Sequence, residues 1–422
     1  MTDSTSDAGS NWAGTHRYGA AALHRPTTIG EAQALVAGAT RIRALGSRHS
    51  FNDLADTDGV LISLAELEDE PLIDAEASTV TVTGGTSYGE LAVFLEQRGW
   101  ALHNMGSLPH ISIAGATATG THGSGDRNGS LSSAVVAVER IGADGDLVRL
   151  SDRDPDFAGA VIALGAIGVV TRLTLRIQPS YQVRQDVFVD LPWSTARAEL
   201  DAIMASAYSV SLFTDWRESA VQQVWVKTRI GEAEPDPGSG FFGAASAGEK
   251  VMSPADEGHD NTTTQGGLPG PWSERLPHFR LDATPSNGDE IQTEYFVDRT
   301  RAIEAVTAVH GLRELLQPHL LISELRSVAG DSQWLSPTRG AASLAIHFTW
   351  KNHPTEVRAL LPTLEAALAP FDARPHWGKW FALAADDVVP KYPHLAAFRN
   401  LADRMDPTGK FRNAYLQRVL GL

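Results

Sequence analysis

The sequence predicts an α+β protein with two domains. Alternation of polar and apolar residues, typical of strands, recurs along the whole chain, and segments with helical periodicity lie between these strands. The chain has 422 residues, 42% of them hydrophobic, which exceeds one ordinary domain and is enough for a large core. Because Pro179 ends the first block of strands, we place a domain boundary near residue 180.

The first block mixes short strands with helices. Its predicted strands cover residues 41–45, 60–64, 79–83, 134–141, 147–150 and 169–177. Its predicted helices cover residues 31–38, 88–98 and 154–164. The helix over 88–98 places Leu91, Phe94 and Leu95 on one face, so we expect that face to be buried.

The second block has longer elements. Its predicted strands cover residues 183–191, 208–213, 222–227, 320–328 and 341–350. Its predicted helices cover residues 195–206, 297–316, 355–368 and 393–404. Residues 231–272 are rich in Gly, Pro, Ala and Ser, which predicts a long irregular excursion that is not part of the core.

Composition excludes several classes of function. The formal net charge of −16 argues against nucleic acid and anionic membranes as partners, since both bind basic surfaces. The chain has no cysteine, which excludes disulfides and thiolate metal ligands, and its 14 histidines lack metal-site spacing, so we expect no metal. Residues 1–11 do not resemble a secretory signal, and no apolar stretch approaches the roughly 20 residues of a membrane span. We expect a cytoplasmic monomer.

Two glycine-rich stretches, over residues 45–52 and 106–125, lie about sixty residues apart. Glycine lets a backbone close around phosphates, because no Cβ blocks the approach and amide groups can point inward. The Rossmann pattern does not occur, because in a motif that begins at Gly123 the sixth position, which requires glycine, is Asn128. Two interpretations stay open at this point, a large phosphate-bearing cofactor or ordinary tight turns.

Two predicted strands of the second block carry polar pairs at alternate positions. Glu324 and Arg326 share one face of strand 320–328, and His347 and Thr349 share one face of strand 341–350. This pattern is typical of the solvent-facing side of an antiparallel sheet. The other interpretation is a hydrogen-bonding platform for a polyhydroxylated ligand.

A third candidate segment is His376-Trp377-Gly378-Lys379. In an extended backbone, Trp377 and Lys379 would lie on one side and His376 on the other. A lysine beside tryptophans is usually a surface residue whose stem covers the ring. Gly378 between two tryptophans indicates a close approach of the backbone to another group.

These motifs together resemble the bacterial alditol oxidases of the vanillyl-alcohol-oxidase flavoprotein superfamily. The segment Gly46-Ser47-Arg48-His49-Ser50-Phe51-Asn52 resembles its covalent-flavin loop, although Arg48 stands where a smaller residue is expected. Residues 107–112, with Gly115 and residues 120–123, resemble its second FAD loop. The polar pairs on residues 320–350, the segment 376–379 and the segment 409–413 are similar to its remaining motifs, so the resemblance covers nearly the whole chain.

The resemblance implies a two-domain FAD-binding fold of the PCMH type. Residues 1–180 with a C-terminal return over 400–422 would form the FAD-binding domain, and residues 181–399 an α/β cap domain built on an antiparallel sheet. His49 would bond covalently to the 8α-methyl carbon of the flavin. The residues implied to bind FAD are Gly46, Ser47, Arg48, His49, Ser50, Ser107, Ser112, Gly115, Ala116, Thr117, Ala118, Gly120, Thr121, His122, Gly123, Ile167, Val169 and Asn413.

The implied reaction oxidises the terminal primary hydroxyl of an alditol such as xylitol, sorbitol or glycerol to the aldose. A hydride would pass to flavin N5, and molecular oxygen would be reduced to hydrogen peroxide. The residues implied to bind substrate are Ser107, Glu324, Arg326, Thr349 and Lys379. Arg326 would stabilise alkoxide charge, and Lys379 or His347 would accept the proton. The alternatives are a sugar-lactone oxidase or dehydrogenase of the same superfamily and a catalytically silent polyol-binding relative.

Overall fold

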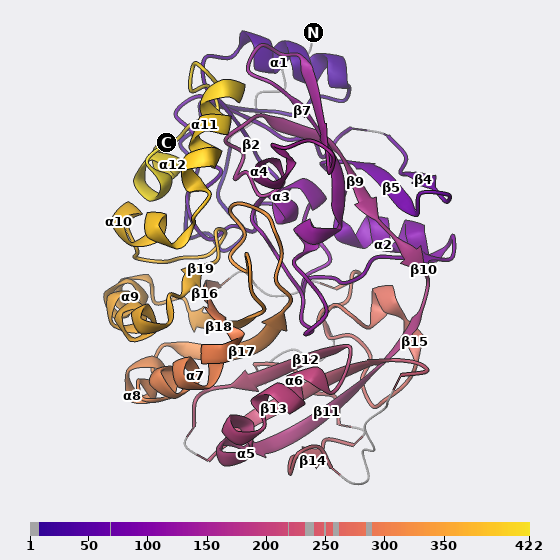
Figure 1. Ribbon diagram of the computed structural model, residues 1–422, viewed down its shortest axis with the longest axis vertical. Helices are drawn as coiled ribbons and strands as arrows, with labels where there is room; N and C mark the ends of the chain where they lie inside the picture. The colour runs from indigo at the N-terminus through magenta and orange to yellow at the C-terminus, as the bar shows by residue number, and fades with distance from the viewer. Residues whose placement is uncertain are drawn as a thin grey trace.

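The computed structural model describes residues 8–67, 69–217, 219–232, 240–248, 250–255, 261–283 and 289–422. Most of segment 1–11 and parts of segment 231–272, both discussed above, lie outside the described residues. In Figure 1 the N-terminal segments up to about residue 180 form the upper part of the molecule, and a large sheet forms the lower part. The C-terminal helices return to the upper part.

The upper part is built on three small sheets within the described residues. Its strands are β1 (Ala22–His24), β2 (Ile42–Ala44), β3 (Val60–Ile62), β4 (Leu72–Asp74), β5 (Thr79–Thr83), β6 (Trp100–Ala101), β7 (Val135–Ile141), β8 (Leu147–Ser151), β9 (Val169–Arg176) and β10 (Gln178–Pro179). A parallel sheet has the order β1-β3-β2, and an antiparallel sheet the order β4-β5-β9-β7-β8. Strands β6 and β10 form an antiparallel pair.

The helices of the upper part begin at recognisable caps. They are α1 (Ile29–Gly38), α2 (Tyr88–Glu96), α3 (Ile113–Ala118) and α4 (Phe157–Ala160). Thr28 caps α1 by accepting a hydrogen bond from the backbone N–H of Glu31. Ser87 and Glu90 form a capping box at the start of α2, which satisfies two backbone donors that the helix leaves free.

The lower part is a nine-stranded antiparallel sheet. Its strands are β11 (Gln182–Pro192), β12 (Ser209–Thr214), β13 (Ala220–Arg229), β14 (Ala245–Ser246), β15 (Gly270–Pro271), β16 (Glu290–Asp298), β17 (Leu320–Val328), β18 (Ser343–Lys351) and β19 (Arg374–Pro375). The order is β14-β11-β13-β12-β17-β18-β16-β19, and β15 also pairs with β11. Together the sheets and helices confirm the predicted α+β class.

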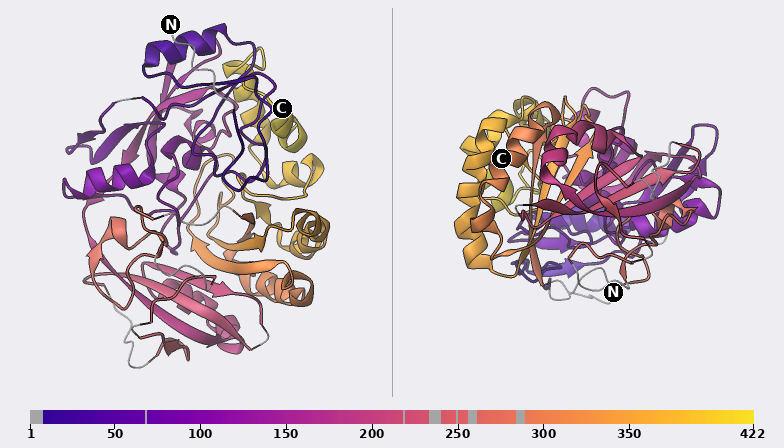
Figure 2. Two further views of the ribbon diagram at one scale, coloured as in Figure 1. Left: turned by 180° about the vertical axis from the view of Figure 1, so that it is seen from behind. Right: turned by 90° about the horizontal axis from the view of Figure 1, so that it is seen from below.

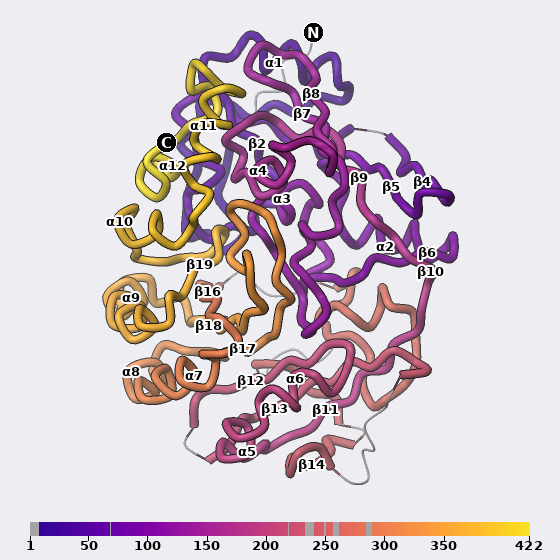
Figure 3. Tube along the Cα trace, viewed as in Figure 1, coloured from indigo at the N-terminus to yellow at the C-terminus, as the bar shows by residue number. Residues whose placement is uncertain are grey.

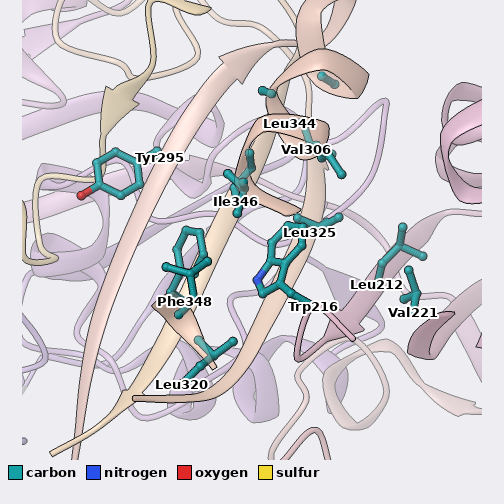
Figure 4. Packing of buried hydrophobic residues seen from close by; sticks show 14 of the residues in the cluster. Leu212, Trp216, Val221, Tyr295, Val306, Leu320, Leu325, Leu344, Ile346 and Phe348 are labelled. Carbon is teal, nitrogen blue, oxygen red and sulfur yellow. The ribbon is translucent and has the colours of Figure 1, made fainter. Parts of the chain in front are cut away.

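One face of the large sheet packs against helices and forms the main hydrophobic core. These helices are α5 (Trp193–Ala198), α6 (Leu200–Ala205), α7 (Ala302–His310), α8 (Arg313–Leu316) and α9 (Pro354–Leu368). Figure 4 shows Leu325, Ile346 and Phe348 from β17 and β18 gathered near Trp216. The Trp216 ring stacks on Phe348 and its Nε1 donates to Ser323 Oγ at 2.8 Å. Alternate residues of these strands face the opposite side.

The C-terminal residues pack against the upper part. Helices α10 (Ala385–Val388), α11 (Leu395–Met405) and α12 (Ala414–Leu420) share a hydrophobic cluster with buried residues between 160 and 167. Figure 2 shows these yellow helices beside the indigo N-terminal segments when the molecule is seen from behind. No helix among the described residues is long and apolar enough to cross a membrane.

Three predicted helices differ from the structure. The helix predicted over 154–164 is only the four-residue α4, because Leu164 and Gly165 have positive φ and residues 160–167 turn into a buried loop. The helix predicted over 297–316 starts too early, since residues 290–298 form β16 and α7 begins at Ala302. The helix predicted over 195–206 is two helices that meet at Glu199.

The excursion over 231–272 is closer to the core than the sequence indicates. Its described residues include β14 and β15, which pair with β11 at the edge of the large sheet. Trp272 is fully buried in the hydrophobic cluster of the upper part. Apolar side chains such as Met252 and Trp272 therefore anchor a segment whose glycine and proline content alone predicts a loop.

We propose the division into residues 1–180 with 400–422 and residues 181–399 as two domains. Strand β10 ends at Pro179 and β11 begins at Gln182, so the sheets change at the proposed boundary. The packing of α11 and α12 on residues 160–167 supports the proposed C-terminal return.

Arg43 links the upper sheets to the C-terminal segment. Its guanidinium is buried and donates to the carbonyl oxygens of Leu54 (2.5 Å), Leu164 (2.8 Å), Gly165 (3.0 Å) and Phe411 (2.7 Å). Burial lowers the pKa of Arg43 to about 10, so the side chain stays charged at neutral pH. Four carbonyl groups from three segments thus depend on one side chain.

We expect Arg43→Met to lower the free energy of unfolding by about 3 kcal/mol, because buried carbonyls lose their donor. Urea denaturation measures this change. Arg41→Met is the control, since Arg41 pairs with Asp58 at 3.3 Å on the surface and should change stability by about 0.5 kcal/mol or less. Equal losses in both variants would contradict the role given to Arg43.

Candidate functional site

A cavity of about 1000 Å³ lies between the loops of the upper part and the large sheet. Residues 43–51 and residues between 106 and 122 line it, as do residues between 160 and 170. Strands β16, β17 and β18 form its floor, and Figure 3 places their labels where the upper part meets the large sheet. Both glycine-rich stretches therefore border the same space as the polar strands.

The two glycine-rich stretches contact each other through Ser47 and Ser112. The backbone N–H of Ser47 donates to Ser112 Oγ (3.3 Å), and the backbone N–H of Ser112 donates to Ser47 Oγ (3.1 Å). A Cβ on Gly46 would lie 2.5 Å from Ser112 Oγ, and one on Gly115 would lie 2.8 Å from it. Only glycine allows this approach, so backbone and small side chains form this wall of the cavity.

His49 presents an unpartnered nitrogen beside the cavity. Its Nδ1 lies 2.8 Å from Ser47 O and acts as the donor to that carbonyl, which leaves the lone pair on Nε2. This Nε2 is buried and has no hydrogen-bond partner among the described residues. The ring stacks on Trp12 with centroids 5.1 Å apart. Burial lowers the pKa of His49 to about 4, although the Ser47 carbonyl opposes the shift, so the imidazole is neutral at neutral pH.

Arg48, the departure from the expected loop sequence, has a left-handed backbone with φ of 64°. Its guanidinium donates to Ala8 O and to Ser10 O (3.2 Å) and lies over the Tyr18 ring. The Arg48 side chain therefore contacts the N-terminal segment. Its backbone still borders the cavity.

The cavity floor is a row of three ionisable side chains on adjacent strands. Strand register pairs Glu294 of β16 with His347 of β18, and His347 with Glu324 of β17. Their exposed fractions are 1%, 8% and 5%. The interpretation of this polar face as solvent-facing is therefore wrong, because the loops of the upper part cover it.

Arg326 lies between the two carboxylates of this row. Its Nη2 donates to Glu294 Oε1 at 2.6 Å, and its Nε lies 3.6 Å from Glu324 Oε2. Its Nη1 reaches Ser107 Oγ at 3.4 Å, which connects the second glycine-rich stretch to the sheet. His122 Nε2 lies 3.2 Å from Glu294 Oε1 and extends the same network.

The cation sets the ionisation of both carboxylates. Burial alone raises the pKa of Glu294 and of Glu324, but the Arg326 guanidinium together with the neighbouring histidines outweighs it and holds both pKa values below the usual range. Burial alone lowers the pKa of Arg326, and the two carboxylates reverse that shift. The three groups are therefore all charged at neutral pH.

Residues 376–379 form a turn, which corrects the extended arrangement considered above. The backbone N–H of Lys379 donates to His376 O at 3.0 Å, so His376 and Lys379 both border the cavity while Trp377 packs on the C-terminal helices. Lys379 Nζ donates to Gln292 Oε1. Asn52 Nδ2 donates to the carbonyls of Trp377 and Lys379 at 2.8 Å, which ties the turn to the first glycine-rich stretch.

The structure brings most of the predicted site residues together around the cavity. Those that line it are Gly46, Ser47, Arg48, His49, Ser50, Ser107, Ser112, Gly115, Ala116, Ala118, Thr121, His122, Ile167, Val169, Glu324, Arg326, His347, Thr349 and Lys379. Those that do not line it are Thr117, Gly120, Gly123 and Asn413. Asn413 instead caps α12 and donates to Leu54 O (3.0 Å) and Asp56 O (2.8 Å), so it supports the first loop from behind.

The polar cavity residues that sequence reasoning missed include His278, Gln292 and Glu294, and it did not identify His376 as a lining residue. The alternation from Glu290 to Glu294 is a strand signal that would have identified Gln292 and Glu294. His278 lies just after the irregular excursion and carries no local signal. Its place in the cavity depends on tertiary contacts alone.

Two family descriptions match the chain. The family described as FAD binding domain matches residues 20–151, and the family described as D-arabinono-1,4-lactone oxidase matches residues 287–419. An alditol oxidase from Streptomyces sp. is 46% identical over 98% of this chain and 99% of its own length. An L-gulono-1,4-lactone dehydrogenase from Mycobacterium tuberculosis is 30% identical, again over 98% and 99% of the two chains.

Solved structures with the same fold include the cholesterol oxidase of B. sterolicum and a solvent-stable cholesterol oxidase. Their TM-scores are 0.77 and 0.78 at 15% and 17% sequence identity. The first covers 98% of this chain and 96% of its own, and the second covers 99% and 98%. This likeness concerns the fold.

The cavity fits FAD. Among the described residues, the wall at Gly46 and Gly115 carries no large side chain, and the buried Nε2 of His49 lacks a partner that a bound group would provide. The polar floor leaves room for a small substrate over the strands. The chain therefore belongs to the alditol oxidase family of the vanillyl-alcohol-oxidase flavoprotein superfamily, as an FAD-dependent oxidoreductase with the PCMH-type fold.

Proposed function

We propose that this protein oxidises the terminal primary hydroxyl of an open-chain alditol, such as xylitol, sorbitol or glycerol, to the aldose. The observation that carries the proposal is the buried polar floor, where a guanidinium, two carboxylates and a histidine lie side by side. Such a floor can donate to and accept from several hydroxyls at once. The full-length similarity to an alditol oxidase supports the choice of substrate.

Bound FAD would supply the electron chemistry, accepting a hydride at N5 and returning two electrons to oxygen as hydrogen peroxide. The chain's own residues would bind and orient the polyol. We assign the hydroxyl contacts to Ser107, Glu324, Arg326, Thr349 and Lys379, all of which line the cavity. Arg326, whose charge the two carboxylates stabilise, would also stabilise developing alkoxide charge.

We assign proton uptake to His347. Its Nδ1 lies 3.5 Å from Glu294 Oε2, and its Nε2 lies 3.2 Å from Thr349 Oγ1. Burial lowers the pKa of His347, although Glu294 opposes the shift, so the ring is neutral and able to accept a proton. Burial lowers the pKa of Lys379 to about 8, with Glu294 again opposing, so this amine is mostly a charged donor at pH 7.

The relationship to lactone enzymes favours one alternative substrate class. The C-terminal part of the chain matches a family described as a lactone oxidase, and an L-gulono-1,4-lactone dehydrogenase is a full-length relative. A sugar-lactone oxidase or dehydrogenase is therefore the second candidate.

We expect kcat/KM for xylitol to exceed that for L-gulono-1,4-lactone, measured by peroxide formation in air. An open chain can place hydroxyls on Glu324, Arg326 and Thr349 at the same time, whereas a closed ring cannot spread along the strands. A higher value for the lactone would overturn the alditol assignment. Purified protein without flavin absorbance would instead support a catalytically silent polyol-binding relative.

We expect kcat/KM for xylitol to fall as the pH rises through about 8, because Lys379 loses the proton that it donates to substrate. In Lys379→Arg, the fall in kcat/KM as the pH rises through about 8 should be smaller, since a guanidinium keeps its charge. A profile that rises through the same pH would instead identify the neutral Lys379 amine as the proton acceptor.

We expect flavin absorbance to remain with the acid-precipitated protein, because the free Nε2 of His49 is available for a covalent bond. His49→Ala should release the flavin to the supernatant. His353→Ala, which also alters a histidine on the cavity wall, should retain it. Yellow supernatant from the unaltered protein would refute the covalent bond while leaving FAD binding intact.

A further inference from the structure

Lys227 is a buried lysine that no step above uses. It lies on β13 with 1% of its surface exposed and does not line the cavity. Its Nζ contacts three acceptors, Leu276 O (2.5 Å), Pro277 O (3.1 Å) and His278 Nδ1 (3.1 Å). An ammonium group has three N–H bonds, so each proton has one acceptor.

The contact with Lys227 determines which nitrogen of His278 carries hydrogen. Because the Lys227 ammonium donates to Nδ1, that nitrogen is the acceptor and Nε2 carries the N–H. Nε2 lies 2.8 Å from Glu324 Oε1 and donates to it. The opposite tautomer would place a bare nitrogen against a carboxylate, which is repulsive.

Aromatic side chains fix the orientation of the His278 ring. Trp225 meets it edge-on with centroids 5.2 Å apart, and Phe213 does so at 5.5 Å. Trp225 is itself held by a hydrogen bond from its Nε1 to Gln223 Oε1 at 2.9 Å. These contacts therefore fix the plane of the imidazole and the direction in which its N–H donates.

The same segment also holds Ser107. The backbone N–H groups of His278 and Phe279 both donate to Ser107 O, at 3.1 Å and 3.2 Å. One short stretch of chain thus contacts two groups, Ser107 and Glu324, that we assign to the substrate hydroxyls.

We propose that Lys227 and His278 are positioning residues that hold the Glu324 carboxylate ionised and in a fixed direction for a substrate hydroxyl. The proposal rests on the proposed function, in which Glu324 binds the polyol. By hydrogen bonds, Lys227 reaches Glu324 only through His278, because its other two acceptors are backbone carbonyls of the same segment and it does not line the cavity.

The ionisation of the three groups agrees with this arrangement. Burial lowers the pKa of His278 to about 4, and the Lys227 charge adds to the effect, so the ring stays neutral with a single N–H. Burial lowers the pKa of Lys227 to about 7, although Glu324 opposes the shift. Below that pH the ammonium form that the three acceptors require predominates.

The tautomer of His278 tests the proposal without any substrate. Nitrogen NMR of histidine-labelled holoenzyme at pH 6, with the His278 signal assigned by its loss in His278→Gln, should show hydrogen on Nε2 and none on Nδ1. Hydrogen on Nδ1, or a doubly protonated ring, would overturn the proposal. Because no turnover is involved, this result is independent of whether the protein oxidises alditols.

Steady-state kinetics with xylitol test the consequence. Lys227→Met and His278→Leu should each raise KM about tenfold with kcat within about twofold of the starting value, because a ground-state contact is loosened. His278→Gln should keep KM within about threefold, since its amide can still donate to Glu324. Lys391→Met is the control, because Lys391 pairs with the exposed Asp372 at 3.0 Å and does not line the cavity.

The double variant Lys227→Met/His278→Leu decides whether Lys227 acts through His278. Its KM should equal that of His278→Leu alone, because His278→Leu already removes the hydrogen bond through which Lys227 acts on Glu324. A further tenfold rise in the double variant would show that Lys227 supports the fold and not the carboxylate. If the unaltered protein did not oxidise xylitol, the proposed function would fail, and the tautomer measurement would still decide the geometry.

Discussion

The buried ion group of Arg326, Glu294 and Glu324 is the interaction on which the rest of the site depends. Two carboxylates and a guanidinium stay charged below the cavity only because each offsets the cost of burying the others. Removing the guanidinium would leave two buried carboxylates without their cation. The group also connects strands β16 and β17 across β18, so the electrostatics and the sheet geometry stabilise each other.

The site and the main core are two faces of the same strands. In β17 and β18, Leu325, Ile346 and Phe348 pack against the helices, while Glu324 and His347 face the cavity. Because strand side chains alternate, a register shift of one residue would bury the charges among the helices and expose the core. The hydrophobic core therefore selects the register that places the ionisable row under the cavity.

The remaining wall comes from segments with little regular structure. The turn at 376–379 is held by Asn52, and the stretch at 276–279 is held by Lys227 and Ser107. In both cases hydrogen bonds to backbone carbonyls give a loop a defined conformation. Such contacts explain how loops from distant parts of the chain can carry side chains with fixed directions, which substrate binding requires.

The sequence by itself determined the α+β class and most strands, and it marked the glycine-rich stretches and the polar strand pairs that border the cavity, because alternation and glycine content are local signals. It could not show that the face of Glu324 and His347 is buried, since the same pattern of polar residues occurs whether water or a cofactor loop covers that face. It missed Glu294 because no strand was predicted over residues 290–296, and His278 because no local pattern marks it. Tertiary structure decided these points: the charge partners lie on strands that are neighbours in the sheet and distant in the chain.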